Sequence, residues 1–132
     1  MWVTNFSSNN VTELNSSGTT VGTYPVATGS YGIAFDGSNM WVTNYGSNNV
    51  TELNSSGTTV GTYPVGTLSY GIAFDGSNMW VTNNGSNNVT RLNSGGTTVG
   101  TYPAGTGPRG IAFDGSNMWV SNFSGNTVTK LP

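Results

Sequence analysis

The chain has 132 residues and a formal net charge of -2, and only 6% of its residues are charged. It contains no cysteine and no histidine, which excludes a disulfide framework, a thiolate nucleophile, and the commonest general base and metal ligand. With three basic residues in all, it also lacks the charge pattern of proteins that bind nucleic acid or an anionic membrane surface.

The dominant feature is a repeat of 39 residues. Each copy opens with Met-Trp-Val-Thr-Asn, or with Met-Trp-Val-Ser-Asn in the last copy, at Met1, Met40, Met79 and Met118. Residues 1–39 and 40–78 differ at only four positions, which is typical of recent duplication, or of deliberate design or selection of a fragment. One such repeat cannot bury its own apolar faces, so stability has to come from neighbouring repeats stacked on one another.

A complete cycle of the repeat predicts four short strands joined by turns. Residues 71–74 form strand A, and residues 79–83, rich in aromatic and β-branched side chains, form strand B. Residues 88–92 form strand C, and residues 97–102 form strand D, which Pro103 closes. Clusters of Asp, Gly, Ser and Asn separate the strands, as tight turns require.

Four antiparallel strands in this order make one blade of a β-propeller. The sequence therefore predicts an all-β fold, a β-propeller of four-stranded antiparallel blades, with about 3.5 blades per chain. We expect a single repeat domain over residues 1–132 that contains two partial and two complete blades. These are strands B–D in 1–30, complete blades in 31–69 and 70–108, and strands A–C in 109–132. A solenoid of parallel strands is the alternative, but its coils are usually shorter.

The motif within strand B resembles a known family. Trp-Val-Thr-Asn at 2–5, 41–44 and 80–83, preceded in complete cycles by Ile-Ala-Phe-Asp-Gly-Ser-Asn, is similar to the YVTN β-propeller repeats. It also resembles NHL-type and virginiamycin B lyase-like propellers, and the likeness covers essentially the whole chain. The resemblance implies a blade but no activity, because propellers host many functions. The lyase branch uses a catalytic histidine and a metal ion, so a chain without histidine inherits no catalytic residue, cofactor or metal from it.

The partial blades predict assembly with a second copy. Open ends expose unpaired strand edges, which invite pairing with another chain. The simplest closed solution is a head-to-tail homodimer with a two-fold axis along the propeller channel. Such a ring has eight blades, or six if the partial blades of two copies merge.

One position of strand C carries charges of both signs. Its occupants are Glu13, Glu52, Arg91 and Lys130. Unlike charges would then meet between the second and third blades, and Lys130 would neighbour the partner's Glu13 in a head-to-tail ring. The alternative is that all four are solvated surface charges, which contribute little.

The repeats differ mainly in the B–C turn and the D–A loop. In a four-stranded meander both connections emerge on one face of the disc, near the mouth of the channel, where loops on a rigid scaffold often bind ligands. The candidate ligand-contacting residues there are Phe6, Tyr31, Tyr45, Tyr70, Asn84 and Arg109. Their aromatic rings would suit a glycan or a peptide, although loops also vary because they need not pack.

Two sets of repeated residues are expected to be structural. The tryptophans at identical strand-B positions should pack between adjacent blades, and they are Trp2, Trp41, Trp80 and Trp119. The carboxylates of the Asp-Gly-Ser-Asn turns should accept backbone N–H groups, and they are Asp36, Asp75 and Asp114. One carboxylate per turn is too few for a calcium site.

The function that follows is a non-catalytic, self-assembling propeller scaffold whose partner is a second copy of itself. We expect no enzyme, because no nucleophile and base can be paired, and we expect no cofactor. The alternative is a lectin-like propeller that binds a carbohydrate or a peptide on its loop face. No signal peptide and no apolar run of membrane-spanning length is visible.

Overall fold

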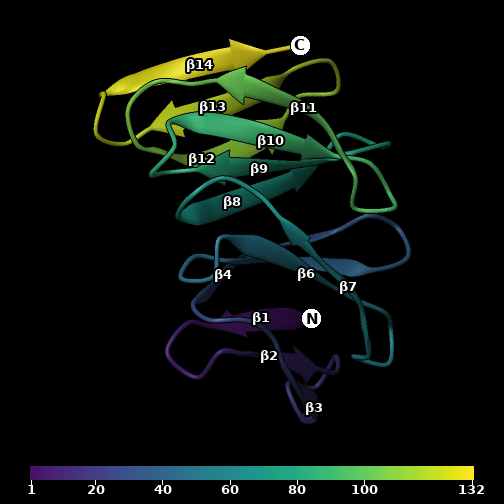
Figure 1. Cartoon of the computed structure of the whole chain (residues 1–132). Coiled ribbons are helices and arrows are strands. Elements are labelled where there is room, and N and C mark those ends of the chain that lie inside the picture. The colour runs from purple at the N-terminus through teal and green to yellow at the C-terminus, as the bar shows by residue number, and fades with distance from the viewer.

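The computed structural model describes all 132 residues, which form fourteen β-strands. The strands make four antiparallel sheets that follow one another along the chain and stack face to face (Figure 1). We number these sheets blade 1 to blade 4. The chain has no helix of the length and apolar character needed to cross a membrane.

The bounds of the strands repeat from blade to blade. Blade 1 contains β1 (Trp2–Asn5), β2 (Asn10–Leu14) and β3 (Thr20–Pro25). Blade 2 contains β4 (Ser30–Phe35), β5 (Met40–Asn44), β6 (Asn49–Leu53) and β7 (Thr59–Pro64). Blade 3 contains β8 (Ser69–Phe74), β9 (Met79–Asn83), β10 (Asn88–Leu92) and β11 (Thr98–Pro103). Blade 4 contains β12 (Pro108–Phe113), β13 (Met118–Asn122) and β14 (Thr127–Leu131).

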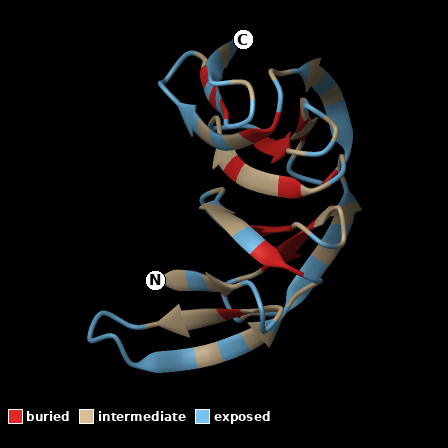
Figure 2. Ribbon diagram, turned by 90° about the vertical axis from the view of Figure 1, so that its left-hand side faces the viewer, coloured by how far each residue is buried: buried red, intermediate tan, exposed pale blue.

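Every blade is a meander in which strands adjacent in sequence pair with each other. Blades 2 and 3 contain strands A to D, blade 1 contains B to D, and blade 4 contains A to C. The predicted all-β propeller architecture of about 3.5 blades is therefore confirmed. The blades fan out in an arc, and the buried residues lie mainly where neighbouring sheets face each other (Figure 2).

Strands A and D differ slightly from the prediction. Strand A of blade 3 begins at Ser69 rather than at Gly71, because Ser69 pairs with Asn83 ahead of a bulge. Strand D begins one residue later than expected and includes Pro103, which is opposite Asn88. A proline is tolerated there because strand D is the edge of its sheet.

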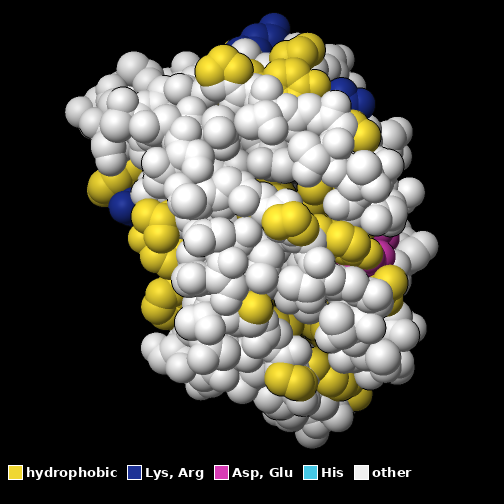
Figure 3. Space-filling model, viewed as in Figure 1, with side chains coloured by type: hydrophobic (Ala, Val, Ile, Leu, Met, Phe, Trp, Pro, Cys, Tyr) yellow, Lys and Arg dark blue, Asp and Glu magenta, His cyan; other side chains and the backbone are white.

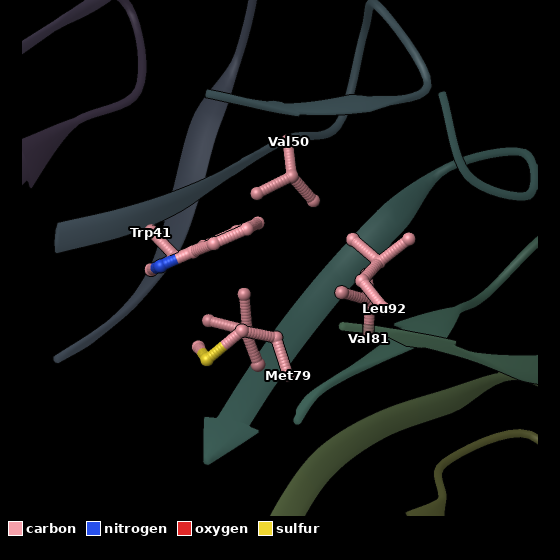
Figure 4. Close-up of a cluster of buried hydrophobic side chains, with 6 residues drawn as sticks. Trp41, Val50, Met79, Val81 and Leu92 are labelled. Atoms are coloured by element: carbon pink, nitrogen blue, oxygen red, sulfur yellow. The ribbon is translucent and has the colours of Figure 1, made fainter. Parts of the chain in front are cut away.

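The apolar core lies between the blades. Successive side chains of a strand point to opposite faces of its sheet. Blade 2 has apolar side chains at both sets of positions, so both of its faces are apolar. In blade 2, Trp41 of strand B and Val50 of strand C point towards blade 3, where they pack against Met79, Val81 and Leu92 (Figure 4). We call the first surface the Trp face and the second the Met face. The same pairing recurs at the other two junctions.

At each junction, the hydroxyl of a strand-B threonine is hydrogen-bonded to a backbone carbonyl in strand A of the next blade. The Thr43 hydroxyl of β5 donates to the carbonyl of Tyr70 at 2.6 Å, and the Thr82 hydroxyl of β9 donates to the carbonyl of Arg109 at 2.8 Å. The backbones approach so closely that a Cβ added at Gly32 would lie 2.6 Å from the Tyr70 carbonyl oxygen. Glycine is therefore required at this position of strand A.

Candidate functional site

Blade 4 leaves its Trp face uncovered. Trp119 is 42% exposed and Val128 is 64% exposed. Their counterparts in blade 3, Trp80 and Val89, are buried against blade 4. Blade 4 therefore presents to solvent the surface that every other blade buries.

Blade 1 leaves its Met face uncovered. Met1 is 82% exposed and Val3 is 39% exposed, while Met79 and Val81 at the same positions are buried. Leu14, the third member of this face, is only half-buried. The two ends of the stack thus present the two kinds of surface that pack on each other at the three internal junctions.

Each predicted structural tryptophan that follows an A–B turn is bonded to the aspartate of that turn. The bonds run from the indole N–H to Oδ2 and measure 2.7 Å for Trp41–Asp36, 2.7 Å for Trp80–Asp75 and 2.6 Å for Trp119–Asp114. The second carboxylate oxygen accepts backbone N–H groups of the same turn, and Asp75 Oδ1 lies 2.7 Å from both Ser77 N and Asn78 N. Both oxygens of these carboxylates therefore already accept hydrogen bonds, one from the tryptophan and one from the turn.

Hydrogen bonding governs the ionisation of these aspartates. Burial opposes the charge on Asp75, but the bonds from Trp80, Asn78 and Ser77 outweigh it and lower its pKa below the usual value. Asp36 has the same balance and also a lowered pKa. The bond from Trp119, followed by the turn N–H groups, lowers the pKa of Asp114 to about 2. No three Asp or Glu side chains gather into a group that could hold a metal ion.

The strand-C charges do not meet across a junction, so the expected contact of unlike charges between blades 2 and 3 is wrong. Glu52 is opposite Trp41, and Arg91 is opposite Trp80, so both lie on the Trp face of their own blade. One whole sheet consequently separates them. The guanidinium of Arg91 instead lies 5.3 Å above the Trp80 ring, and Lys130 takes the same place 5.5 Å from Trp119.

Glu52 is also not a solvated surface charge. It is buried, and its carboxylate accepts hydrogen bonds from Asn39 Nδ2 at 2.6 Å and from the Tyr63 hydroxyl at 2.7 Å. Burial, together with this carboxylate, raises the pKa of Tyr63 to about 12. The charge therefore closes a polar network at the junction of blades 2 and 3.

The B–C turns and D–A loops lie together on one face of the stack. Tyr45 N donates to the carbonyl of Gly29 at 2.9 Å, and Gly46 N donates to the carbonyl of Thr28 at 3.0 Å. From the preceding blade, Asn9 Oδ1 accepts the N–H of Gly29 at 2.8 Å. The loop that precedes each strand A is thus fixed from both sides, as a rigid platform for the variable side chains.

Five of the six candidate ligand-contacting residues form a continuous strip on this face. The ring centroids of Tyr31 and Tyr70 lie 3.9 Å apart, and their hydroxyl groups are hydrogen-bonded. Phe6 lies 6.1 Å from Tyr31, and Tyr45 lies 6.2 Å from Phe6 and 6.1 Å from Tyr70. The guanidinium of Arg109 continues the strip 5.1 Å above the Tyr70 ring.

Phe123 completes what we call the aromatic strip, which consists of Phe6, Tyr31, Tyr45, Tyr70, Arg109 and Phe123. Arg109 lies 3.8 Å above the Phe123 ring, beside a depression of about 420 Å³. The sequence signal for Phe123 was present, because it occupies the same turn position as Phe6. Hydrophobic side chains with one basic group among them gather along the left-hand margin of Figure 3.

Asn84 is the candidate that makes no stacking contact in the strip. It occupies the turn position of Tyr45 one repeat later. Its backbone N–H donates to the carbonyl of Leu68 at 3.0 Å, and its side-chain Nδ2 is buried without a hydrogen-bond partner. The third turn therefore offers an amide where the others offer a ring.

Solved structures with a similar fold are known. No family model matches the chain, and no curated protein matches its sequence. It is similar to a streptogramin B lyase (TM-score 0.85, 25% identity, 98% of this chain and 46% of that one). It is equally similar to a catalytically inactive virginiamycin B lyase from Staphylococcus aureus solved with quinupristin (TM-score 0.84, 25% identity, 98% and 47%).

A further structure shares the fold at lower identity. Hydrazine synthase from Kuenenia stuttgartiensis matches with a TM-score of 0.82 and 23% identity, over 90% of this chain and 37% of that one. The chain thus spans about half the length of the lyases, or less than half of the synthase. The likeness to the two lyases supports a relation of the chain to the β-propeller proteins.

Proposed function

We propose that the chain is a non-catalytic propeller scaffold that closes into a ring as a head-to-tail homodimer. The observation that carries this proposal is the exposure of Val128 on the Trp face of blade 4, where Val11, Val50 and Val89 are fully buried. Fully burying a valine, methionine or similar side chain contributes about 1.5–3 kcal/mol. An uncovered Trp face and an uncovered Met face therefore favour a second copy at each end.

Eight blades are favoured over six. A six-bladed ring would displace one copy of the B–C segment. The displaced copy would be either β13 and β14, with the buried side chains of Met118, Val120 and Leu131, or β1 and β2, with the buried side chain of Val11. An eight-bladed ring keeps these contacts and adds two junctions in which Trp119 and Val128 face the partner's Met1 and the partner's Val3. The added burial supports the larger ring.

Composition supports a scaffold without catalysis. The chain has no histidine or cysteine, and its three aspartates already accept hydrogen bonds within their own turns. The Trp-Val-Thr-Asn phrase supports grouping the repeats with the YVTN type, and the near-identity of the copies supports recent duplication or design.

The test is the solution mass, measured by light scattering coupled to size exclusion over a range of concentrations. We expect a dimer that persists on dilution, and we expect Val128→Glu to convert it into a monomer with unchanged β-sheet content. Val60→Glu is the matched control, because Val60 is an exposed valine on the edge strand β7, away from the open faces. A monomer in the unmodified chain, or a dimer that tolerates Val128→Glu, would overturn the proposal.

A lectin-like function is the second candidate, and the aromatic strip is the observation that favours it. Phe6, Tyr31 and Phe123 are exposed although each is a large ring, and aromatic planes bind sugars and peptides by stacking. A glycan array probes this candidate directly. Binding that Tyr31→Ser abolishes and Tyr31→Phe retains would support it, and an array without hits would leave the scaffold alone.

A further inference from the structure

The edge of β1 that faces away from β2 has no neighbouring strand. In blades 2, 3 and 4, strand B lies between strand A and strand C, as β5 lies between β4 and β6. β1 is a strand B that pairs with β2 alone. Its other edge therefore presents unpaired backbone groups, which can template an added strand.

The hydroxyl of Thr4 is held ready to accept a hydrogen bond on that edge. It donates to the carbonyl of Tyr31 at 2.7 Å, as Thr43 donates to the carbonyl of Tyr70. The Thr43 oxygen also accepts the N–H of Gly32 in strand A at 2.7 Å. Thr4 has the same donor contact and no strand-A N–H to accept.

The indole of Trp2 is fixed in place but lacks an acceptor. Its ring stacks on Tyr24 with a centroid distance of 5.2 Å, as Trp41 stacks on Tyr63 at 5.4 Å. The Trp41 indole N–H is bonded to Asp36, whereas that of Trp2 makes no hydrogen bond. An aspartate that arrived at the equivalent place would find an oriented donor.

We propose that the free edge of β1 is a docking site for an extended peptide of the pattern Gly-Ile-Ala-Phe-Asp. The register follows from blade 2, where Ile33 is opposite Val42, Ala34 is opposite Trp41 and Phe35 is opposite Met40. On β1 the peptide isoleucine, alanine and phenylalanine lie opposite Val3, Trp2 and Met1. The glycine N–H bonds to the Thr4 hydroxyl, and the aspartate bonds to the Trp2 indole.

The geometry also sets the selectivity of this edge. Glycine is required because the Tyr31 carbonyl would meet a Cβ there, as the Tyr70 carbonyl would at Gly32. The alanine must be small because its counterpart Ala34 packs into the junction with the next blade. The aspartate supplies the only charge, and its bond to an indole N–H is a charge-assisted hydrogen bond.

This inference does not depend on the homodimer. The proposed contact between copies uses the face of blade 1, whereas the peptide uses the edge of β1. A monomer and an eight-bladed dimer both present the edge, and only a six-bladed dimer, in which β12 of the second copy would pair with β1, covers it. The mass measurement and the binding measurement therefore test different contacts.

The experiment titrates the full chain into a fluorescein-labelled peptide with the sequence of residues 30–39 and follows anisotropy. We expect saturable binding with one peptide per chain. Peptides with Gly32→Val or with Asp36→Ala should bind about tenfold more weakly or worse, on the scale of one lost charge-assisted hydrogen bond or one steric clash. A scrambled peptide of the same composition is the control for nonspecific binding.

The Trp2→Phe variant of the chain identifies the acceptor. It should weaken binding of the aspartate peptide by about tenfold and leave binding of the Asp36→Ala peptide unchanged. Trp119→Phe is the matched control and should not alter peptide affinity, because its indole belongs to blade 4. Absence of saturable binding would overturn the proposal, and so would equal affinity for all three peptides. A Trp2→Phe variant that weakens binding of the Asp36→Ala peptide as much as binding of the aspartate peptide would also overturn it.

A second copy is the competing occupant, through its own strand β12 and Asp114. A chain carrying Val3→Cys and Ile111→Cys would then form a disulfide between copies, and the peptide would fail to bind the unmodified dimer. That result would assign the edge to the partner chain and overturn the peptide docking site.

Discussion

The indole N–H of Trp80 donates a hydrogen bond to Asp75 Oδ2 across 2.7 Å. The bond ties a tryptophan buried at a blade junction to the turn that precedes its strand. The same pair recurs in blade 2 at its junction with blade 3, so turn geometry and junction packing are coupled at two junctions. Blade 4 has the pair as well, on its uncovered Trp face. Because the acceptor must be ionised to do this best, the stability of the stack should depend on pH.

We expect the free energy of unfolding to fall as the pH is lowered from about 4 to about 2. The pKa of Asp114 is about 2 in the folded chain, against about 3.9 for an ordinary aspartate. The pKa values of Asp36 and Asp75 are also lowered. A lowered pKa contributes stability above the unfolded value, and that stability is lost as the pH falls through the folded value. Urea unfolding at a series of pH values measures the loss. Asp114→Asn should flatten the profile, and a flat profile in the unmodified chain would contradict the assignment.

Leu53→Ala should destabilise the fold much more than Leu14→Ala. Leu53 is fully buried at the junction of blades 1 and 2, and a buried Leu→Ala change costs about 2–5 kcal/mol. Leu14 holds the same position on the open Met face and is half-buried. Denaturant unfolding compares the two variants in the Val128→Glu background, where the proposed contact between copies is removed and the Met face of blade 1 stays open. Equal losses in that background would contradict the difference in burial.

Gly71→Ala and Gly110→Ala are a second matched pair. A Cβ at Gly71 would collide with the carbonyl oxygen of Arg109, which belongs to the backbone of the next blade and cannot turn away. A Cβ at Gly110 would meet the Ser121 hydroxyl at 2.7 Å, and a hydroxyl can rotate. We expect a loss of about 1–3 kcal/mol for Gly71→Ala, typical of overpacking, and a smaller loss for Gly110→Ala. Thermal unfolding of both variants checks the order, and its reversal would refute the close approach of the strands.

Leu68→Gly should stabilise the chain. Leu68 has φ 55°, in the left-handed region, while Gly29 and Gly107 hold the same loop position with φ 75° and 66°. Relief of a non-glycine residue from this region is worth about 1 kcal/mol, partly offset by the greater freedom of glycine in the unfolded chain. Leu68→Ala is the control, because it shortens the side chain and keeps the strained backbone. A gain in melting temperature for alanine as large as that for glycine would contradict the explanation.

The fold could be predicted because the repeat supplies several readings of the same strand. Strands B and C of blade 3 have the bounds expected from the sequence, because Met79 and Leu92 mark one end of each strand and an asparagine next to the B–C turn marks the other. The sequence predicts the start of strand A two residues too late, because Ser69 carries no apolar signal and pairs across a bulge. The hydrogen bonds between strands are made by backbone groups, which nearly every residue has. The sequence alone therefore does not mark the residue at which pairing begins.

The candidate site was predictable in position more than in contact. The 39-residue period implies that Tyr31 and Tyr70 occupy equivalent places, so their meeting on one face follows from stacking. The stacking of Arg109 on Phe123 does not follow from spacing alone. The strand-C charges show the limit most clearly. A period locates Glu52 and Arg91 along the strand, but whether they meet depends on which face of the sheet each one occupies.

The junction between a Trp face and a Met face is the same chemical object wherever it occurs. A crossover between any two copies of the repeat in the gene would keep the reading frame and would join strands whose side chains already fit. Blades can therefore be gained, lost or circularly permuted without requiring a new kind of junction. The number of blades can change by whole repeats while the packing between neighbouring blades stays the same.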